Sequence, residues 1–434
     1  MKTNVKSLPA KTNEGAIAKK INPELQLRRS VMACMLFENT FYEDGVEISD
    51  RIKALIPKVK AEKVSEMAIE AREKMKLRHV PLLIVREMAR IPSHKHLVAD
   101  TLERVIQRPD ELSEFVAIYW KDGRQPLSAQ AKKGLAMAFL KFNEYSLAKY
   151  NHDGTVKLKD VLFLCHAKPA GKDQEALWKR LIEGKLKTPD TWEVALSAGE
   201  DKKKAWERLI KEGGLGALAF LRNLRNMKEA NVSEEVVLNG LGKIDPGRVL
   251  PFRFISAARY APQWEAEIEK VMMKCLEKHE KLPGHTVLLI DVSGSMDDTL
   301  SGKSEMTRVD AACGLAILLR EICENVSIFT FSNKLEPIPA RHGFALRDAI
   351  DGSQDHGVTE TGKAVRIINN SADYDRLIII TDEQSHDSVQ DPKSTGYVIN
   401  VAPYKNGIGY GKWTHVDGFS EATVDYVMAS EKED

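Results

Sequence analysis

Three segments of the sequence carry hydroxyl and carboxylate side chains at spacings suited to binding a metal ion. The first is the stretch 291–295 (DVSGS), the second contains Thr359, and the third ends in Asp382. In a D-x-S-x-S turn, alternate side chains point toward one centre, and Gly294 permits the tight path. Oxygen ligands without His or Cys suit a hard cation such as Mg²⁺, which also relieves repulsion between two carboxylates. The sequence therefore predicts a divalent-metal site built from Asp291, Ser293, Ser295, Thr359 and Asp382.

Other chemistries fit these residues less well. A phosphotransferase would need a second aspartate at the position of Ser293, and a serine hydrolase would need a G-x-S-x-G motif. The five cysteines are scattered without a C-x-x-C pair, so neither a zinc site nor a disulfide framework is expected. A capped turn at a helix start, with no metal, stays open as the alternative.

The predicted metal ligands lie in a region where short apolar runs alternate with helical patterns. We assign residues 283–434 to one α/β domain with a doubly wound, Rossmann-like parallel sheet, because strands that alternate with helices form such sheets. Ligands of these sheets bind beyond the carboxyl ends of the strands. The expected strands are 286–290, 326–331, 376–380 and 397–401, with an edge strand at 334–338, and the expected helices are 307–323, 343–350, 360–370 and 420–429.

The region before this domain has a helical pattern throughout. Many short helices joined by tight turns predict antiparallel pairs that stack as HEAT-like repeats over residues 24–282. Residues 1–23 are polar and lysine-rich, which is typical of a flexible N-terminal arm. Apolar residues recur three and four apart in 61–77, 80–90, 96–107, 129–149, 204–212, 214–227 and 263–279, with proline-containing breakers between them.

The chain shows no sign of a membrane or secretory role. It has no run of about 18 apolar residues, which a transmembrane helix would need. It also lacks an apolar stretch of signal-peptide type after its first lysines. We therefore expect a cytoplasmic protein with no membrane partner.

The net charge of +1 hides an asymmetry between the two regions. Residues 285–434 contain 13 Lys and Arg against 24 Asp and Glu, whereas residues 1–284 contain 51 against 39. A basic half is what a nucleic-acid binder needs, because neutralised phosphates release counterions. A solvated helical surface gives the same balance, so charge alone leaves both interpretations open.

Two stretches of the basic half concentrate cations on one surface. A turn between two predicted helices exposes a corner with Lys149, Lys157, Lys159, His166 and Lys168. Further along, Arg222 and Arg225 lie three residues apart and share one helical face. Each set has a structural alternative: His166 as a helix cap, and the two arginines as partners of nearby glutamates.

The metal pattern closely resembles the metal-ion-dependent adhesion site of von Willebrand factor A domains. All five positions match in order and in a fitting secondary-structure context. The resemblance implies that Ser293, Ser295 and Thr359 bind the ion directly, and that Asp291 and Asp382 bind directly or through water. Val358 stands where a second glycine is frequent, which leaves the ligands untouched.

The helical half resembles the TROVE module of the Ro autoantigen family, in which a von Willebrand A domain follows. The matching segments are Lys149-Tyr150, 159–169 (KDVLFLCHAKP), Trp192-Glu193 and 215–227 (LGALAFLRNLRNM). The resemblance implies a ring of helical repeats closed by the A domain. It also implies that small structured RNAs of the Y type bind an outer basic face, and that single-stranded 3′ ends of misfolded RNAs enter the central hole.

The same resemblance assigns roles to individual residues. His166 and Lys149 would contact the structured RNA, although Asp153 stands where the family has an arginine, a reversal of charge. Residues near the hole would be Arg124, Gln125, Lys132 and Lys133, the last two of which can instead form a solvated face.

We therefore expect a monomeric, non-catalytic RNA-binding protein of the Ro type that acts in RNA quality control or processing. Its Mg²⁺ site would serve a protein partner, such as an exoribonuclease. Two other functions stay open. One is a metal-dependent protein-interaction scaffold with no RNA role. The other is a metal-assisted RNA hydrolase, for which a second metal and a general base are missing.

Overall fold

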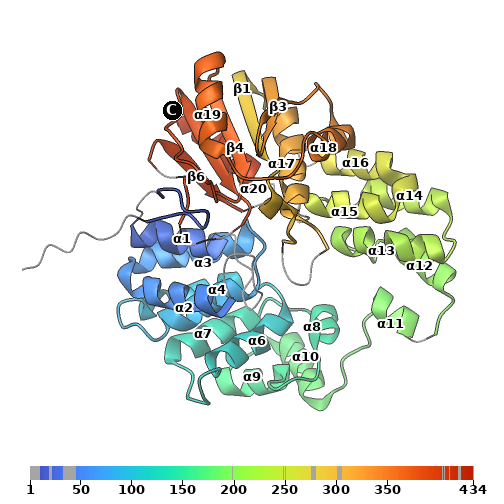
Figure 1. The fold of residues 1–434 in the computed structure, drawn as a ribbon. Coiled ribbons are helices and arrows are strands. Elements are labelled where there is room, and N and C mark those ends of the chain that lie inside the picture. Colours follow the sequence, from blue (N-terminus) through green and yellow to red (C-terminus); the bar gives the residue numbers. More distant parts are fainter. Residues whose placement is uncertain are drawn as a thin grey trace, which may run out of the picture. The chain divides into compact units, whose positions relative to one another are not determined.

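A computed structural model describes most of the chain in two compact units, residues 48–215 and residues 1–47 with 216–434 (Figure 1). Within the described residues, no helix is long and apolar enough to cross a bilayer. The described residues are 10–18, 22–32, 45–197, 199–247, 249, 251–274, 280–300, 305–402, 404, 406–409, 411–418 and 422–433.

The unit 48–215 is a stack of short helices in two layers. One layer contains α3 (Ala61–Glu73), α5 (Val98–Val105), α7 (Ala129–Phe139) and α9 (Leu158–Cys165), each packed against the next. The other contains α4 (His79–Met88), α6 (Pro109–Tyr119), α8 (Glu144–Tyr150) and α10 (Lys172–Glu183). Helix α2 (Gly45–Leu55) precedes the stack, and α11 (Trp192–Ser197) and α12 (Lys202–Lys211) follow it. This alternation is that of HEAT-like pairs, and closure into a ring stays a prediction.

One expected helix is interrupted. The pattern over 129–149 predicts a single helix, but α7 ends at Phe139 and α8 begins at Glu144. Asn143 explains the break, because its side-chain oxygen accepts a 2.9 Å hydrogen bond from the Ser146 N–H and caps α8. The break lets α7 pack with α5 and α9 while α8 packs with α6 and α10.

The second unit contains helical pairs that lead into the α/β domain. Helices α13 (Ala217–Glu229) and α15 (Phe252–Tyr260) pack in line with α17 (Arg308–Ile322). Helices α14 (Glu234–Lys243) and α16 (Glu265–Met273) do the same with α18 (Gly343–Asp351). Gly314 of α17 permits the close approach, because an added Cβ would lie 3.1 Å from the Pro251 side chain. Charged contacts reinforce it: Arg259 pairs with Asp310, Arg347 with Glu265, and Glu269 accepts from the Phe344 N–H.

The sheet confirms the expected doubly wound topology. Its strand order is β3-β2-β1-β4-β5-β6, and every neighbouring pair is parallel except β2 with β3. Strand β6 was not expected from the sequence. The strands are β1 (Leu282–Asp291), β2 (Cys323–Phe331), β3 (Leu335–Pro337), β4 (Arg376–Thr381), β5 (Thr395–Asn400) and β6 (Trp413–Asp417).

Alternate residues of the central strands face two helical layers. Val287 and Leu289 of β1 belong to a core cluster with α19 (Thr361–Ser371), whereas α17 packs against β1 and β4. Helix α20 (Ala422–Glu433) packs against α17 and β6. The register pairs Ile290 with Ile380. The carboxyl ends of β1 and β4 therefore lie side by side, where Asp291 and Asp382 leave the sheet.

The N-terminal segment packs against the loop that follows β4. Thr12 donates a buried 2.8 Å hydrogen bond to the Ser385 carbonyl, and the Asn13 N–H donates to the Gln384 side chain at 2.8 Å. In α1 (Pro23–Met32), Arg29 has no exposed surface and pairs with the equally buried Glu383. Of the segment expected as a flexible arm, residues 10–18 are thus a packed strap, while 1–9 and 19–21 lie outside the described residues.

The Arg29–Glu383 pair should be essential for stability. Arg29→Met should lower the free energy of unfolding by about 3 kcal/mol, because it leaves the buried Glu383 carboxylate without its counter-charge. The double variant Arg29→Met/Glu383→Gln should recover part of the loss, because both charges are then absent. Urea denaturation of the full chain measures both effects. An unchanged midpoint for Arg29→Met would contradict this role.

Candidate metal centre and basic surfaces

The loops that carry the predicted metal ligands interlock. Strand β1 ends at Asp291, and the 3₁₀ turn Gly294–Asp297 brings Ser295 back toward the sheet. The Gly294 N–H donates a 2.8 Å hydrogen bond to the Gly357 carbonyl, which joins the first loop to the one that carries Thr359. Thr359 is buried, and its backbone N–H and carbonyl both bond to His386, in the loop after β4.

Within this framework the ligand side chains come together. Ser295 Oγ donates to Asp382 Oδ2 at 2.7 Å and lies 3.4 Å from Ser293 Oγ. Asp291 accepts hydrogen bonds from the Ser293 N–H at 2.9 Å and from Thr381 Oγ1 at 2.5 Å. The structure thus gathers Asp291, Ser293, Ser295 and Asp382 at the carboxyl ends of β1 and β4, and it holds Thr359 in the loop bonded to Gly294.

The two carboxylates of the centre are buried close to each other. Asp291 and Asp382 have no exposed surface. Burial, reinforced by the charge of Asp382, raises the pKa of the Asp291 carboxyl to about 7. A divalent cation would offset this repulsion, and the hydroxyl and carboxylate oxygens fit a hard ion. No group of three or more His, Cys, Asp or Glu is placed to hold a metal among the described residues, so an ion here depends on the hydroxyls.

A fixed cation also lies at this centre, and the sequence analysis missed it. Arg308, the first residue of α17, is buried; its Nη1 donates to the Ser295 carbonyl at 2.9 Å and lies 3.4 Å from Asp382 Oδ2. Thr307 Oγ1 accepts a 3.1 Å hydrogen bond from the Asp310 N–H and caps α17, which fixes Arg308 as the first residue of this helix. No spacing rule connects Arg308 to the ligand motif, because its approach depends on how α17 packs.

The corner around α8 and α9 holds the first set of predicted RNA-binding residues. The imidazole of His166 is exposed, and its backbone ends α9 in the left-handed region at φ 53°. His166 therefore caps the helix through its backbone and leaves its side chain at the surface. Lys149 Nζ lies 5.8 Å from the Tyr150 ring centre. Lys159 and Lys168 are exposed, whereas Lys157 pairs with Asp153 at 2.7 Å, so the reversed charge at Asp153 neutralises a neighbouring lysine.

The second predicted set lies at the start of α7. The guanidinium of Arg124 stacks on the Trp120 ring at 4.8 Å, and Trp120 Nε1 donates to the Gln125 carbonyl at 2.6 Å. Lys133 is exposed on α7, and Lys132 is half-buried. Arg124 is therefore held on an aromatic platform, while Lys133 has the exposure of a solvated face.

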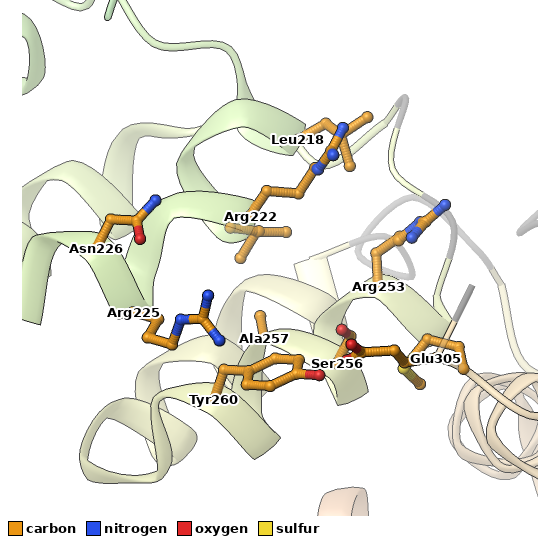
Figure 2. Close-up of a pocket in the computed structure, with 11 residues that line it drawn as sticks. Leu218, Arg222, Arg225, Asn226, Arg253, Ser256, Ala257, Tyr260 and Glu305 are labelled. Carbon is orange, nitrogen blue, oxygen red and sulfur yellow. The ribbon is translucent and has the colours of Figure 1, made fainter. Parts of the chain in front are cut away.

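The third set, Arg222 and Arg225, lines a pocket of about 290 Å³ between α13 and α15. Figure 2 shows both side chains directed into it together with Arg253 and Tyr260, which the sequence analysis missed. The two-layer arrangement could have pointed to them, because helices two apart in the sequence pack against each other, as α13 and α15 do. The glutamate alternative holds only weakly for Arg225, whose Nε lies 3.8 Å from Glu229 Oε1 with both side chains well exposed.

Comparisons with known proteins agree with this architecture. The family model of the TROVE domain matches residues 178–287, and that of the Ro60 vWA domain matches residues 285–395. The crystal structure of the Deinococcus radiodurans Ro (RSR) protein aligns with a TM-score of 0.61, covering 94% of this chain and 99% of that chain at 18% identity. That likeness shows a shared fold. A comparison with curated proteins finds no match.

The buried Asp291 should make metal-free stability fall as pH rises from about 4 to 7, because the folded state holds the proton that the unfolded state has lost. Asp291→Asn should therefore raise the thermal midpoint in EDTA at about pH 8. Excess Mg²⁺ should stabilise the unaltered protein if the ion binds at this centre, and the same change should abolish that stabilisation. Thermal scans with and without MgCl₂ measure both effects. Continued stabilisation of this variant by Mg²⁺ would show that the ion binds elsewhere.

Arg308 should weaken the binding of a divalent ion, because its charge already partly neutralises Asp382. Arg308→Gln should raise Mg²⁺ affinity by about ten-fold, since removing a nearby positive charge strengthens the attraction of the remaining carboxylates. Isothermal calorimetry on the full chain measures the affinity. Arg320→Gln, at the other end of α17, is the matched control. A lower affinity in Arg308→Gln than in the control would reverse the assignment.

Proposed function

Because the chain joins a TROVE domain to a Ro60 von Willebrand factor A domain, the domain order of the Ro family, we propose that it is a non-catalytic RNA-binding protein of that type. It binds small structured RNAs and the unpaired ends of misfolded non-coding RNAs, and it acts in RNA quality control or processing. The pairing of the two domain matches on one chain is the observation that carries this proposal.

Three groups of cations support the proposal. The exposed side chains around α9, Arg124 on its tryptophan, and the arginines of α13 all suit contacts to phosphates, which set affinity without reading sequence. Specificity for RNA then comes from shape and from unstacked bases, which aromatic and apolar surfaces accept.

The metal centre has a separate role in this proposal. The residues Asp291, Ser293, Ser295, Thr359 and Asp382 would hold Mg²⁺, and the bound ion would serve to attract a carboxylate of a protein partner, such as an exoribonuclease. We assign no cleavage reaction to the ion, because a single ion with mostly neutral ligands lacks the two-metal arrangement used for phosphodiester hydrolysis. The ion and the RNA thus use different parts of the chain.

The proposal predicts that the purified protein retains cellular small RNA and that its RNA affinity falls steeply as salt rises. Lys149→Ala/His166→Ala should weaken binding of a co-purified structured RNA by about ten-fold, because two phosphate-contacting groups are lost. Filter binding across a salt series measures the change.

The matched control is Lys202→Ala/Lys203→Ala, which removes two exposed lysines of α12. An equal loss in that control would show that only net charge matters. Protein that arrives free of nucleic acid and shows no salt-sensitive binding to any small RNA would exclude RNA binding and favour the protein-interaction scaffold.

A further inference from the structure

The pocket between α13 and α15 concentrates positive charge. Arg222 and Arg225 reach it from α13 and Arg253 from α15, and Figure 2 shows the three guanidinium groups around one opening. Of the described residues that line the pocket, Glu305 alone is acidic. Three cations therefore face one carboxylate.

Two of the three arginines of this pocket lack an acidic partner among the described residues. Burial, and then the charge of Arg222, lowers the pKa of the Arg253 guanidinium. Within the described part of the chain, neither Arg222 nor Arg253 has an ion pair with a carboxylate, whereas Arg259, on the same helix as Arg253, pairs closely with Asp310 at 2.5 Å. Like charges held together at a partly buried site favour an anion between them, and phosphate suits the planar fork of arginine.

The rest of the lining adds surfaces that a bare anion would not use. Tyr260 is 41% exposed and Leu218 is 40% exposed, so an aromatic ring and an aliphatic side chain both remain uncovered. The Cζ atom of Arg225 lies 5.5 Å from the centre of the Tyr260 ring, over its face. An exposed tyrosine beside arginines is what a stacked base with its phosphate requires.

Asn226 supplies a directional polar group at the pocket wall. Its side-chain nitrogen donates to Asn223 Oδ1 at 2.8 Å, and Asn223 in turn donates to the Ala219 carbonyl at 2.8 Å. This chain of hydrogen bonds fixes the amide of Asn226, so that its carbonyl oxygen remains able to accept from a ligand N–H. A base presents such donors on its edge, whereas an inorganic phosphate does not.

We propose that this pocket binds one nucleotide of unpaired RNA, with its phosphate between Arg222 and Arg253 and its base against Tyr260. The inference rests on the proposed RNA-binding function and adds the subsite that such RNA would occupy. A volume of about 290 Å³ is near the lower limit for small-molecule sites, which suits a single nucleotide rather than a longer segment. The carboxylates of an acidic peptide would meet the arginines but would not stack on the Tyr260 ring.

The test measures binding of a fluorescein-labelled oligouridylate of about ten nucleotides to the full chain. Arg222→Ala/Arg253→Ala should weaken binding by about ten-fold. It should also reduce the slope of log affinity against log salt by about 0.7, the value for one phosphate of a single strand. Tyr260→Ala should weaken binding by about five-fold or more, and Tyr260→Phe should keep nearly all of it, because the ring carries the stacking.

Two further variants separate this effect from folding and from net charge. Glu305→Gln removes the carboxylate of the pocket and should tighten binding by roughly two- to three-fold, an increase that a misfolded protein cannot produce. Lys228→Ala/Lys243→Ala removes two positive charges from α13 and α14 outside the pocket lining and should leave binding within about two-fold.

The outcome for a hairpin RNA without single-stranded ends distinguishes this inference from the proposed function. If Arg222→Ala/Arg253→Ala binds the oligouridylate as the unaltered protein does, the subsite is wrong, even though the hairpin still binds. If neither RNA binds the unaltered protein, both ideas are wrong. If a polyglutamate peptide competes equally with the oligouridylate and Tyr260→Ala changes nothing, the pocket takes acidic protein segments instead.

Discussion

Three carboxylates with no exposed surface lie together at the carboxyl ends of β1 and β4, and the packing around them follows from the need to offset their charge. Asp291 ends β1, and Asp382 and Glu383 directly follow β4. Burying an unpaired carboxylate costs several kcal/mol, so each requires a cation or several donors. Arg29 from the N-terminal helix pairs with Glu383, and Arg308 from α17 lies beside Asp382. A divalent ion between Asp291 and Asp382 would complete this compensation.

The residues that offset these buried charges come from distant parts of the sequence. The A domain is therefore packed against segments that lie outside it in the sequence. The strap at residues 10–18 and α1 contact the loop after β4, while α15 packs against α17. Arg259 of α15 pairs with Asp310, in the first turn of α17, two residues after Arg308. Helix α15 also carries Arg253 and Tyr260 of the arginine pocket. One packed contact thus joins the helix of that pocket to the helix that carries Arg308, the arginine beside the candidate metal centre.

The sequence predicted what depends on local periodicity and on ligands close to strand ends. Four of the predicted strands carry strong apolar runs, whereas the edge strand at 334–338 (KLEPI) does not. The D-x-S-x-S motif and Asp382 follow two of the apolar strands directly. Strand β6 (Trp413–Asp417) is short, and a glycine-containing segment precedes it, so its pattern is weak. The apolar period over 129–149 continues across Asn143, although α7 ends at Phe139 and the Asn143 side chain caps the start of a new helix, α8. Arg29 and Arg308 carry no signal at all, because only tertiary packing brings them to their sites.

The basic surfaces, too, can be predicted only in part from the sequence. Counting lysines and arginines gives the surplus of the helical region, but a count cannot say which cations already have partners. Lys157 is held by Asp153 and Arg208 by Asp190, so these charges are largely compensated by the protein itself. Arg253 is different, because it is partly buried next to Arg222, and Glu305 is the only acid among the described residues that line the pocket. An uncompensated charge that is held in place by packing costs free energy in the unbound protein, and a bound anion would lower that cost. The strongest electrostatic indication of a ligand is therefore a pair of arginines that approach each other, not the stretch with the most lysines.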